Sequence, residues 1–173
     1  EIDYPELKDN YAVLVAASNG WKNYRHQADV LGMYHYLKGK GYDDDHIILI
    51  IADDIAYNEK NPLQGVVRRE IGGDNLYKDI RIDYKSGNLT LEDLKQILTG
   101  ESSETHPVTL GSCENDNVLF FWSGHGTQQG WKWKEEDLNA DFVRAMFSDM
   151  QFRKMFAIVE TCYSGAVAQD FTR

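Results

Sequence analysis

Four short, nearly continuous apolar segments constrain the fold of this chain more than any other feature of its sequence. Each has five to seven residues and is rich in strand-forming side chains; they are residues 11–17, 46–52, 118–122 and 155–161. None of them shows the polar–apolar alternation of a strand with one solvated face. Strands buried on both faces occur in parallel sheets that helices cover on both sides. The sequence therefore predicts an α/β protein with a doubly wound, mostly parallel sheet.

The segments between these runs carry helix and turn signals. Residues 25–40 have apolar side chains at helical spacing, and residues 138–150 repeat the pattern. Thr90 and Asp93 resemble a capping box that opens a helix through residue 98. A strand, a helix and a second strand within about forty residues predict a right-handed βαβ unit. Residues 65–71 and 76–84 flank a Gly-Gly-Asp-Asn sequence, which predicts an inserted β-hairpin.

Size and charge limit the class of protein and its partners. The chain has 173 residues, which fits one domain, residues 1–173. Its formal net charge of −10 argues against nucleic acid and against an anionic membrane surface as partners. No apolar run approaches the roughly 18 residues of a membrane span. The first residues have neither the basic nor the apolar region of a signal peptide, so the chain is either cytosolic or has lost its leader.

Reactive side chains follow three of the predicted strands. His125 lies between two glycines after the third strand, and Cys162 ends the fourth. Asn23, Arg25 and His26 follow the first strand. The carboxyl ends of parallel strands gather at one edge of the sheet, where open α/β folds place their sites. Taken singly, a packed histidine and an inert buried cysteine are equally reasonable, but together they favour a Cys/His pair for nucleophilic catalysis.

Four ordered blocks of sequence resemble the legumain (asparaginyl endopeptidase) family of cysteine peptidases. The same blocks resemble a relative of that family, the catalytic subunit of the GPI-anchor transamidase. The blocks are residues 18–29, 53–57, 123–126 and 160–165, and the resemblance runs from about residue 11 to about residue 168. It implies a caspase-like α/β fold, with residues 1–173 as the N-terminal, larger part of a single catalytic domain. It also implies a thiol protease, a hydrolase that cleaves after Asn, with Asp as a second candidate, through a thioester acyl-enzyme.

The resemblance also implies roles for individual residues. Cys162 becomes the nucleophile and His125 the general acid/base, and the backbone N–H groups of Gly126 and Cys162 bind the oxyanion. Asn23 orients the histidine. The floor of the primary specificity pocket falls on Arg25, His26 and Glu160. An Arg/Glu pair offers both donors and an acceptor, which suits a carboxamide better than an apolar side chain.

The chain departs from the legumain pattern in two places. Legumains carry an aspartate immediately before the catalytic histidine, whereas this chain has Gly124, which matches the transamidase-like and caspase-like branches. A transamidase that passes the acyl group to an amine therefore stays open, as does a catalytically silent caspase-like binding module. Further strands follow the nucleophile strand in the family. We therefore expect a second chain or a C-terminal segment to complete the sheet and one wall of the pocket.

The remaining expectations concern metals, cofactors and location. Asp53 and Asp54 offer oxygen ligands but lack the spacing of a known calcium loop, so we expect no metal. The chemistry needs no cofactor. Residues 88–90 form an Asn-Leu-Thr glycosylation sequon, which has meaning only in a secretory protein. We expect an extracytoplasmic location (secreted, periplasmic, or lysosomal or vacuolar) rather than the cytoplasm.

Overall fold

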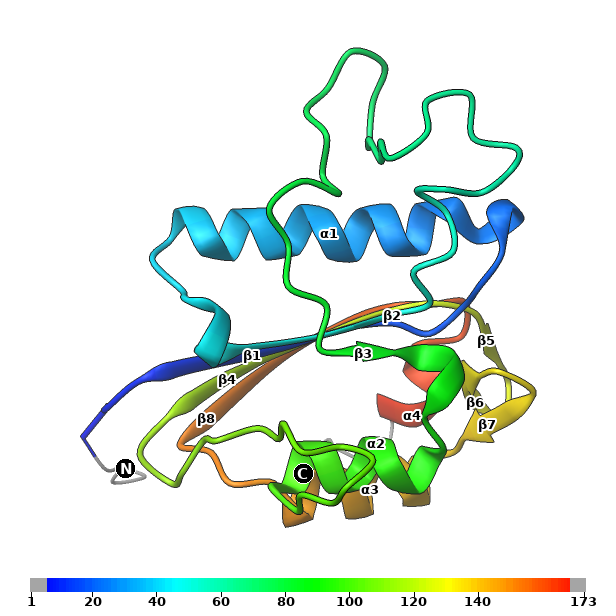
Figure 1. Cartoon of the computed structure of the whole chain (residues 1–173). Helices are drawn as coiled ribbons and strands as arrows, with labels where there is room; N and C mark the ends of the chain where they lie inside the picture. The colour runs from blue at the N-terminus through cyan, green and yellow to red at the C-terminus, as the bar shows by residue number, and fades with distance from the viewer. Residues whose placement is uncertain (1–5, 169–173) are drawn as a thin grey trace.

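A five-stranded parallel sheet organises the protein (Figure 1). The computed structural model describes residues 6–168. The strands lie in the order β3-β2-β1-β4-β8, and each neighbouring pair is parallel. Their bounds are β1 Asn10–Ala16, β2 Ile47–Ile51, β3 Tyr84–Lys85, β4 Asn117–Ser123 and β8 Lys154–Glu160. The four apolar segments thus form four of the five strands, and the predicted α/β class is confirmed.

Helices cover both faces of the sheet (Figure 1). α1 (Tyr24–Gly39) lies on one face, while α2 (Leu91–Thr99) and α3 (Ala140–Asp149) lie on the other. Successive residues of β1 alternate between the two layers: Val13 belongs to the core beneath α2 and α3, and Leu14 to the core beneath α1. Both are fully buried, which explains why β1 has no polar face.

Local signals set the helix ends. The Thr90 side chain accepts from the backbone N–H of Asp93, and the Asp93 carboxylate accepts from the backbone N–H of Thr90, so the predicted capping box is confirmed. Asn139 caps α3 in the same manner through the N–H of Phe142. Short helical turns complete the connections: η1 Trp21–Asn23, η2 Asp44–His46, η3 Ser86–Asn88 and α4 Gly165–Ala168.

The predicted hairpin across residues 65–84 is wrong. Apart from Tyr84, the first residue of β3, this region contains no strand; it forms a long excursion above α1 (Figure 1). One backbone hydrogen bond joins the two segments, from the N–H of Leu76 to the carbonyl of Val67 at 2.7 Å, and asparagine side chains make further bonds in place of cross-strand partners. The Asn75 side chain accepts from the N–H of Val67 and donates to the carbonyl of Gly65, and Asn61 donates to the carbonyl of Val66. Because side chains satisfy these backbone groups, the two segments have no need of a β ladder.

The antiparallel insertion lies later in the chain. It consists of β5 (Gly126–Thr127), β6 (Gly130–Trp133) and β7 (Glu136–Leu138), which form a separate three-stranded sheet. Trp131 and Trp133 on β6 are buried against the core beneath α2 and α3. This packing fixes β5, and with it the segment directly after His125.

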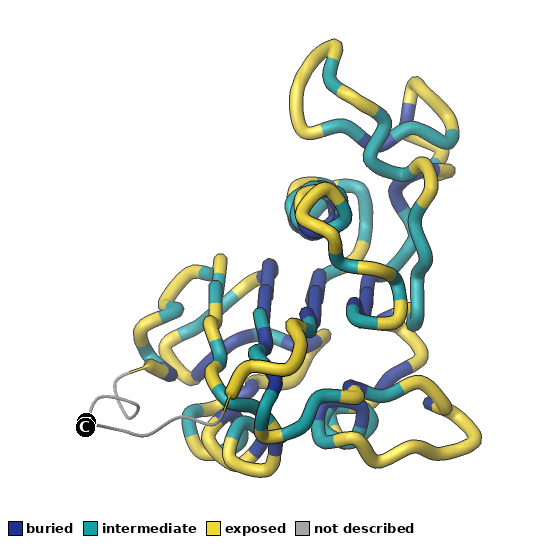
Figure 2. Tube along the Cα trace, turned by 90° about the vertical axis from the view of Figure 1, so that its left-hand side faces the viewer, coloured by how far each residue is buried: buried dark blue, intermediate teal, exposed yellow. Residues whose placement is uncertain are grey.

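β8 forms an edge of the described sheet. It pairs with β4 on one side, and within residues 6–168 no strand pairs with its other side. Phe156 on β8 is 68% exposed, although β1, two strands away, is almost wholly buried. Figure 2 shows the buried residues gathered between the layers and exposed residues on the outer loops. Within the same residues, no helix has the length and apolar character needed to cross a bilayer.

Candidate active site

The ends of β4 and β8 bring the loops of His125 and Cys162 together. Ser123 pairs with Glu160 at the last position of the β4–β8 register, and the N–H of Gly124 donates to the carbonyl of Glu160 at 3.1 Å. His125 and Cys162 therefore each follow a paired strand end by two residues. The two motifs lie at the same edge of the sheet on adjacent strands.

Gly126 packs directly against the backbone of Cys162. A Cβ added at Gly126 would overlap the carbonyl oxygen of Cys162 and would lie 2.8 Å from the Thr161 hydroxyl oxygen. Only glycine therefore fits without moving the cysteine. This contact holds the segment after His125 against the residue that follows β8.

If the chain is the cysteine peptidase that its sequence leads us to expect, replacing Gly126 with alanine should displace Cys162 and lower turnover by about a hundredfold, the scale that a shift of about 1 Å in a reacting group produces. Gly39→Ala is the control, since a Cβ at Gly39 meets nothing within 4 Å. Steady-state kinetics on a peptide substrate measure the difference. Equal activity of the two variants would show that the close contact does not hold the cysteine in place.

The two cysteines of the chain are both free thiols in different surroundings. Cys162 is exposed, while Cys113 is partly buried in the loop that leads into β4. Tyr163, directly after Cys162, has a positive φ of 53°, so the chain turns sharply there before α4. The Cys162 thiol is therefore open to a reagent or a substrate, as a nucleophile requires.

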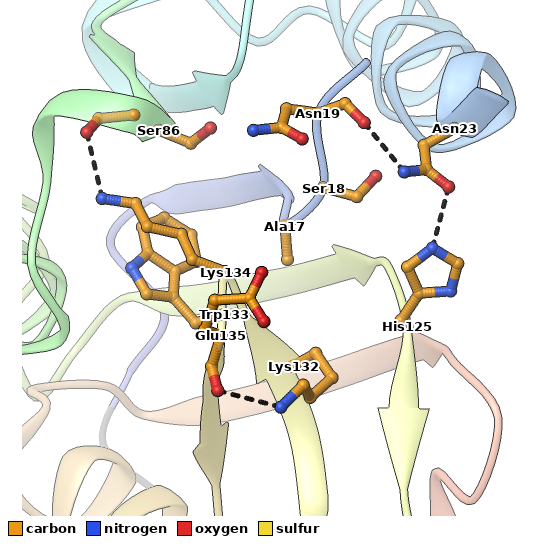
Figure 3. Close-up of a pocket in the computed structure, with 11 residues that line it drawn as sticks. Ala17, Ser18, Asn19, Asn23, Ser86, His125, Lys132, Trp133, Lys134 and Glu135 are labelled. Atoms are coloured by element: carbon orange, nitrogen blue, oxygen red, sulfur yellow. Dashed lines mark hydrogen bonds between the residues drawn. The ribbon is translucent and has the colours of Figure 1, made fainter. Parts of the chain in front are cut away.

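A hydrogen bond to Asn23 fixes which ring nitrogen of His125 carries the proton. The Asn23 amide nitrogen donates to the carbonyl of Asn19 at 2.8 Å, so its Oδ1 faces His125 (Figure 3). His125 Nε2 lies 2.8 Å from that oxygen. An amide oxygen only accepts, so Nε2 carries the proton and Nδ1 has the lone pair. The ring is held in the form that can accept a proton at Nδ1.

His26 lies buried beside His125. It is 5% exposed, and its Nδ1 lies 2.6 Å from the Ser18 hydroxyl. The two histidine rings meet edge to face, with centroids 4.9 Å apart and an interplanar angle of 84°. Burial lowers the pKa of His26 to about 4, helped by the neighbouring Arg25 and His125 side chains. His26 is therefore neutral at neutral pH.

The structure does not join Arg25 to Glu160. Both residues are exposed, no ion pair links them in the described part of the chain, and the Arg25 guanidinium donates to the carbonyl of Lys22 at 3.3 Å. Glu160 instead lines a cavity of about 260 Å³ with Asp29 and Arg69. Partial desolvation and the Asp29 charge raise the pKa of Glu160, while Arg69 opposes the rise. The paired pocket floor expected from the sequence is not formed here.

Sequence reasoning missed Arg69 as a neighbour of this site. Arg69 lies in the excursion above α1, within the segment assigned to a hairpin, and its Nε is 3.5 Å from a carboxylate oxygen of Asp29. No local pattern signals this contact, because it depends on how the irregular segment folds over α1. Asp29 lies inside the first block that resembles the legumain family, and that was its only signal.

A second cavity, of about 190 Å³, opens beside His125 on the side of β1 (Figure 3). Lys134 closes its far end by donating to the carbonyls of Gly87 and Leu89 at 3.0 and 2.7 Å. Further polar side chains that line it are Ser18, Asn19, Asn23, Ser86, Lys132 and Glu135. Since β8 lies on the other side of β4, this cavity and Cys162 flank His125 from opposite sides.

An exposed cysteine and a histidine on adjacent strand ends, with a third side chain that orients the histidine, is the arrangement expected of an enzyme with a cysteine nucleophile. The model of the Peptidase C13 family matches residues 10–173, and the chain belongs to this family. The resemblance read from the four sequence blocks is thereby confirmed.

Known relatives fall into several named groups. The chain is 34% identical over 173 residues to the GPI-anchor transamidase of Saccharomyces cerevisiae, covering 94% of this chain and 42% of the relative. It is 35% identical over 164 residues to a hemoglobinase of Schistosoma japonicum, covering 92% and 38%. It is 32% identical over 175 residues to human legumain, covering 96% and 40%. The chain spans about half or less of the length of the curated relatives that it matches.

Proposed function

We propose that the protein is a cysteine endopeptidase that cleaves peptide bonds after Asn through an acyl-enzyme on Cys162. The observation that carries this proposal is the hydrogen bond from His125 Nε2 to Asn23 Oδ1. It leaves the Nδ1 lone pair available to a neighbouring thiol, which is what a general base needs. An exposed free cysteine on the adjacent strand end supplies the thiol.

The reaction would run in two halves. His125 Nδ1 takes the proton of the Cys162 thiol, and the thiolate attacks the scissile carbonyl carbon to form a tetrahedral intermediate. The backbone N–H groups of Gly126 and Cys162 stabilise its oxyanion. His125 then gives its proton to the leaving amine, the C–N bond breaks, and a thioester remains. Water, deprotonated by His125, attacks the thioester and releases the acid and the free thiol.

Arg25 and Glu160 are our proposed readers of the Asn side chain. Both side chains are exposed near the end of the sheet that carries Cys162. Because they form no ion pair with each other in the described part of the chain, both can bind the same ligand side chain. The guanidinium would donate to the carboxamide oxygen, and the Glu160 carboxylate would accept from the carboxamide nitrogen. His26 was expected in the same pocket floor from the sequence, but its side chain is buried.

The substrate preference can be measured on peptides that differ only at the residue before the scissile bond. We expect Asn to be cleaved best and Asp mainly at acid pH, where a neutral carboxyl group resembles the amide. Arg25→Ala should lower kcat/KM for the Asn peptide by about a hundredfold, the value of a charge-assisted hydrogen bond. Lys22→Ala, a nearby exposed cation, is the matched control. Equal cleavage after Leu, or an equal effect of the two substitutions, would contradict this pocket.

A transamidase is the second candidate function. Gly124 precedes His125 where legumains carry aspartate, and several relatives are named GPI-anchor transamidase. Both reactions share the same thioester and differ in whether water or an amine attacks it. Adding hydroxylamine to the Asn peptide assay separates them. Hydroxamate formed in preference to acid at millimolar amine would favour the transamidase, whereas acid as the main product would favour the peptidase.

We also propose that a further segment or a second chain pairs with the open edge of β8. The edge is exposed at Phe156, and an apolar groove of about 440 Å³ runs beside it, lined in part by Met155, Ala157 and Val159. Intact-mass spectrometry of the active protein tests this. We expect a polypeptide longer than 173 residues or a co-purifying fragment. A species ending at Arg173 that cleaves an Asn peptide alone would contradict the proposal.

An extracytoplasmic location is our proposal for the compartment. Asn88 of the sequon is exposed on η3, so a glycan could be attached there without disturbing the core. Protein isolated from its native source should lose mass on glycosidase treatment if this location is right. An unglycosylated form found only in the cytosolic fraction would contradict it.

A further inference from the structure

Ser18 and His26 form a buried unit next to the reacting histidine. Ser18 follows β1, and His26 lies in the first turn of α1. The short contact between the Ser18 hydroxyl and His26 Nδ1 fixes the orientation of the His26 ring. With 5% of its surface exposed and Nδ1 engaged, His26 presents little to a substrate. What it does present is a ring surface to His125.

We propose that His26, oriented by Ser18, is a positioning residue that sets the tilt of the His125 ring, and not a ligand of the specificity pocket. This inference rests on the proposed function. A single hydrogen bond from Nε2 to Asn23 fixes the position of that nitrogen but allows the ring to rotate about the bond. An edge-to-face neighbour at 84° opposes that rotation, because aromatic rings lose contact area when they leave this geometry. The two contacts together aim Nδ1 in one direction.

Because His26 is neutral, it can lie beside His125 without opposing the protonation of that ring. When His125 takes the thiol proton it becomes an imidazolium, and a second positive charge 4.9 Å away would oppose that step. Burial, together with the nearby Arg25, keeps His26 uncharged throughout the neutral range. A lysine or an exposed histidine at this position would lack this property.

The test compares Ser18→Ala, His26→Phe and His26→Ala with the wild type in two assays. The first follows alkylation of Cys162 by iodoacetamide between pH 5 and 9, which reports the thiolate held by His125. The second separates kcat from KM on the Asn peptide. We expect His26→Ala to lower kcat about tenfold or more with KM changed less than about twofold. Its alkylation at pH 6.5 should fall by a similar factor.

The other two variants resolve how the effect arises. His26→Phe keeps a ring against His125 and should recover part of the loss, while Ser18→Ala removes only the orienting hydroxyl and should lose about threefold to tenfold. Ser18→Ala removes a single oxygen atom, so it keeps the test decisive if His26→Ala fails to fold. Thermal unfolding of each variant verifies that the protein remains folded at the assay temperature.

The possible outcomes distinguish failure of the positioning role of His26 from failure of the proposed peptidase function. A raised KM and altered Asn selectivity in His26→Ala, with an unchanged alkylation profile, would overturn the positioning role and assign His26 to the pocket. Unchanged kinetics and alkylation in folded His26→Ala and Ser18→Ala would overturn it as well. If wild-type alkylation shows no enhanced reactivity at pH 6.5 and is unaffected by His125→Ala, the proposed function fails and the inference fails with it.

Discussion

Replacing Cys162 with alanine is expected to lower cleavage of an Asn peptide by about four orders of magnitude or more. The substitution removes the sulfur that forms the thioester, and the neighbouring Thr161 hydroxyl is a far weaker nucleophile than a thiolate. Cys162 is exposed and follows β8, so the change leaves the two core clusters intact. The melting temperature should therefore stay close to that of the wild type while activity is lost.

Cys113→Ala provides the matched control for this loss. Cys113 is the other free thiol, and its backbone N–H donates to Asp116 in the loop before β4, at the opposite end of that strand from His125. Its replacement should leave kcat/KM within about twofold of the wild type. If both variants keep full activity, the reaction does not pass through a cysteine, and the assignment to a thiol peptidase is wrong.

Replacing His125 with alanine is expected to lower kcat by about a thousandfold or more at neutral pH, since general acid–base catalysis of this kind contributes about 10² to 10⁴ in rate. The residual activity should rise with pH, because the thiol must then lose its proton to solvent. A pH series of kcat/KM for the variant measures this. A variant profile parallel to that of the wild type would show that His125 is not the base.

His46→Gln is the control for the histidine substitution. His46 lies at the amino end of β2, where its two ring nitrogens contact Asp43 and Asp9 at 2.6 and 2.8 Å. Those contacts raise the pKa of His46, chiefly through the bond to Asp43. This substitution can lower stability below the raised pKa, where the ion pairs exist, but it should not change the pH dependence of kcat. An equal loss in both variants would point to misfolding.

The central sheet is predictable from sequence because its strands are buried on both faces. A segment such as residues 11–17 has no polar position, so both of its faces must be buried, and few structures other than a central parallel strand allow this. The structure moves the boundary by one residue, to Asn10–Ala16. The helix after Thr90 can also be predicted from local sequence, since its capping box is complete within four residues. Such elements depend on interactions that the sequence shows directly.

The excursion between β2 and β3 is not predictable in the same way. Its apolar residues and glycines resemble two strands around a turn, but Asn61 and Asn75 take the backbone hydrogen bonds that a hairpin would have made. Tyr24 of α1 also binds the backbone of Arg68 through its hydroxyl group. These contacts join residues up to 44 positions apart, so no window of sequence contains them.

The residues of the candidate site also fall into a predictable and an unpredictable group. His125 and Cys162 each follow an apolar strand, so topology alone places them at one edge. The cavity that Glu160 shares with Arg69 could not be predicted in that way, because Arg69 comes from the irregular excursion. The packing of His26 against His125 was also hidden, since it depends on the entry angle of α1. Strand-end chemistry can be derived from sequence, whereas contacts between loops cannot.

Covalent trapping tests directly whether Cys162 is the nucleophile and whether the site prefers Asn. The protein is incubated at neutral pH with a peptide vinyl sulfone that carries Asn next to the electrophile, and the digested protein is read by mass spectrometry. We expect one adduct per chain, located on Cys162. It should form much more slowly in His125→Ala and with the matching Leu reagent, and it should be absent from Cys162→Ala. An adduct on Cys113, or labelling of Cys162 at the same rate by the Asn and Leu reagents and in His125→Ala, would contradict these expectations.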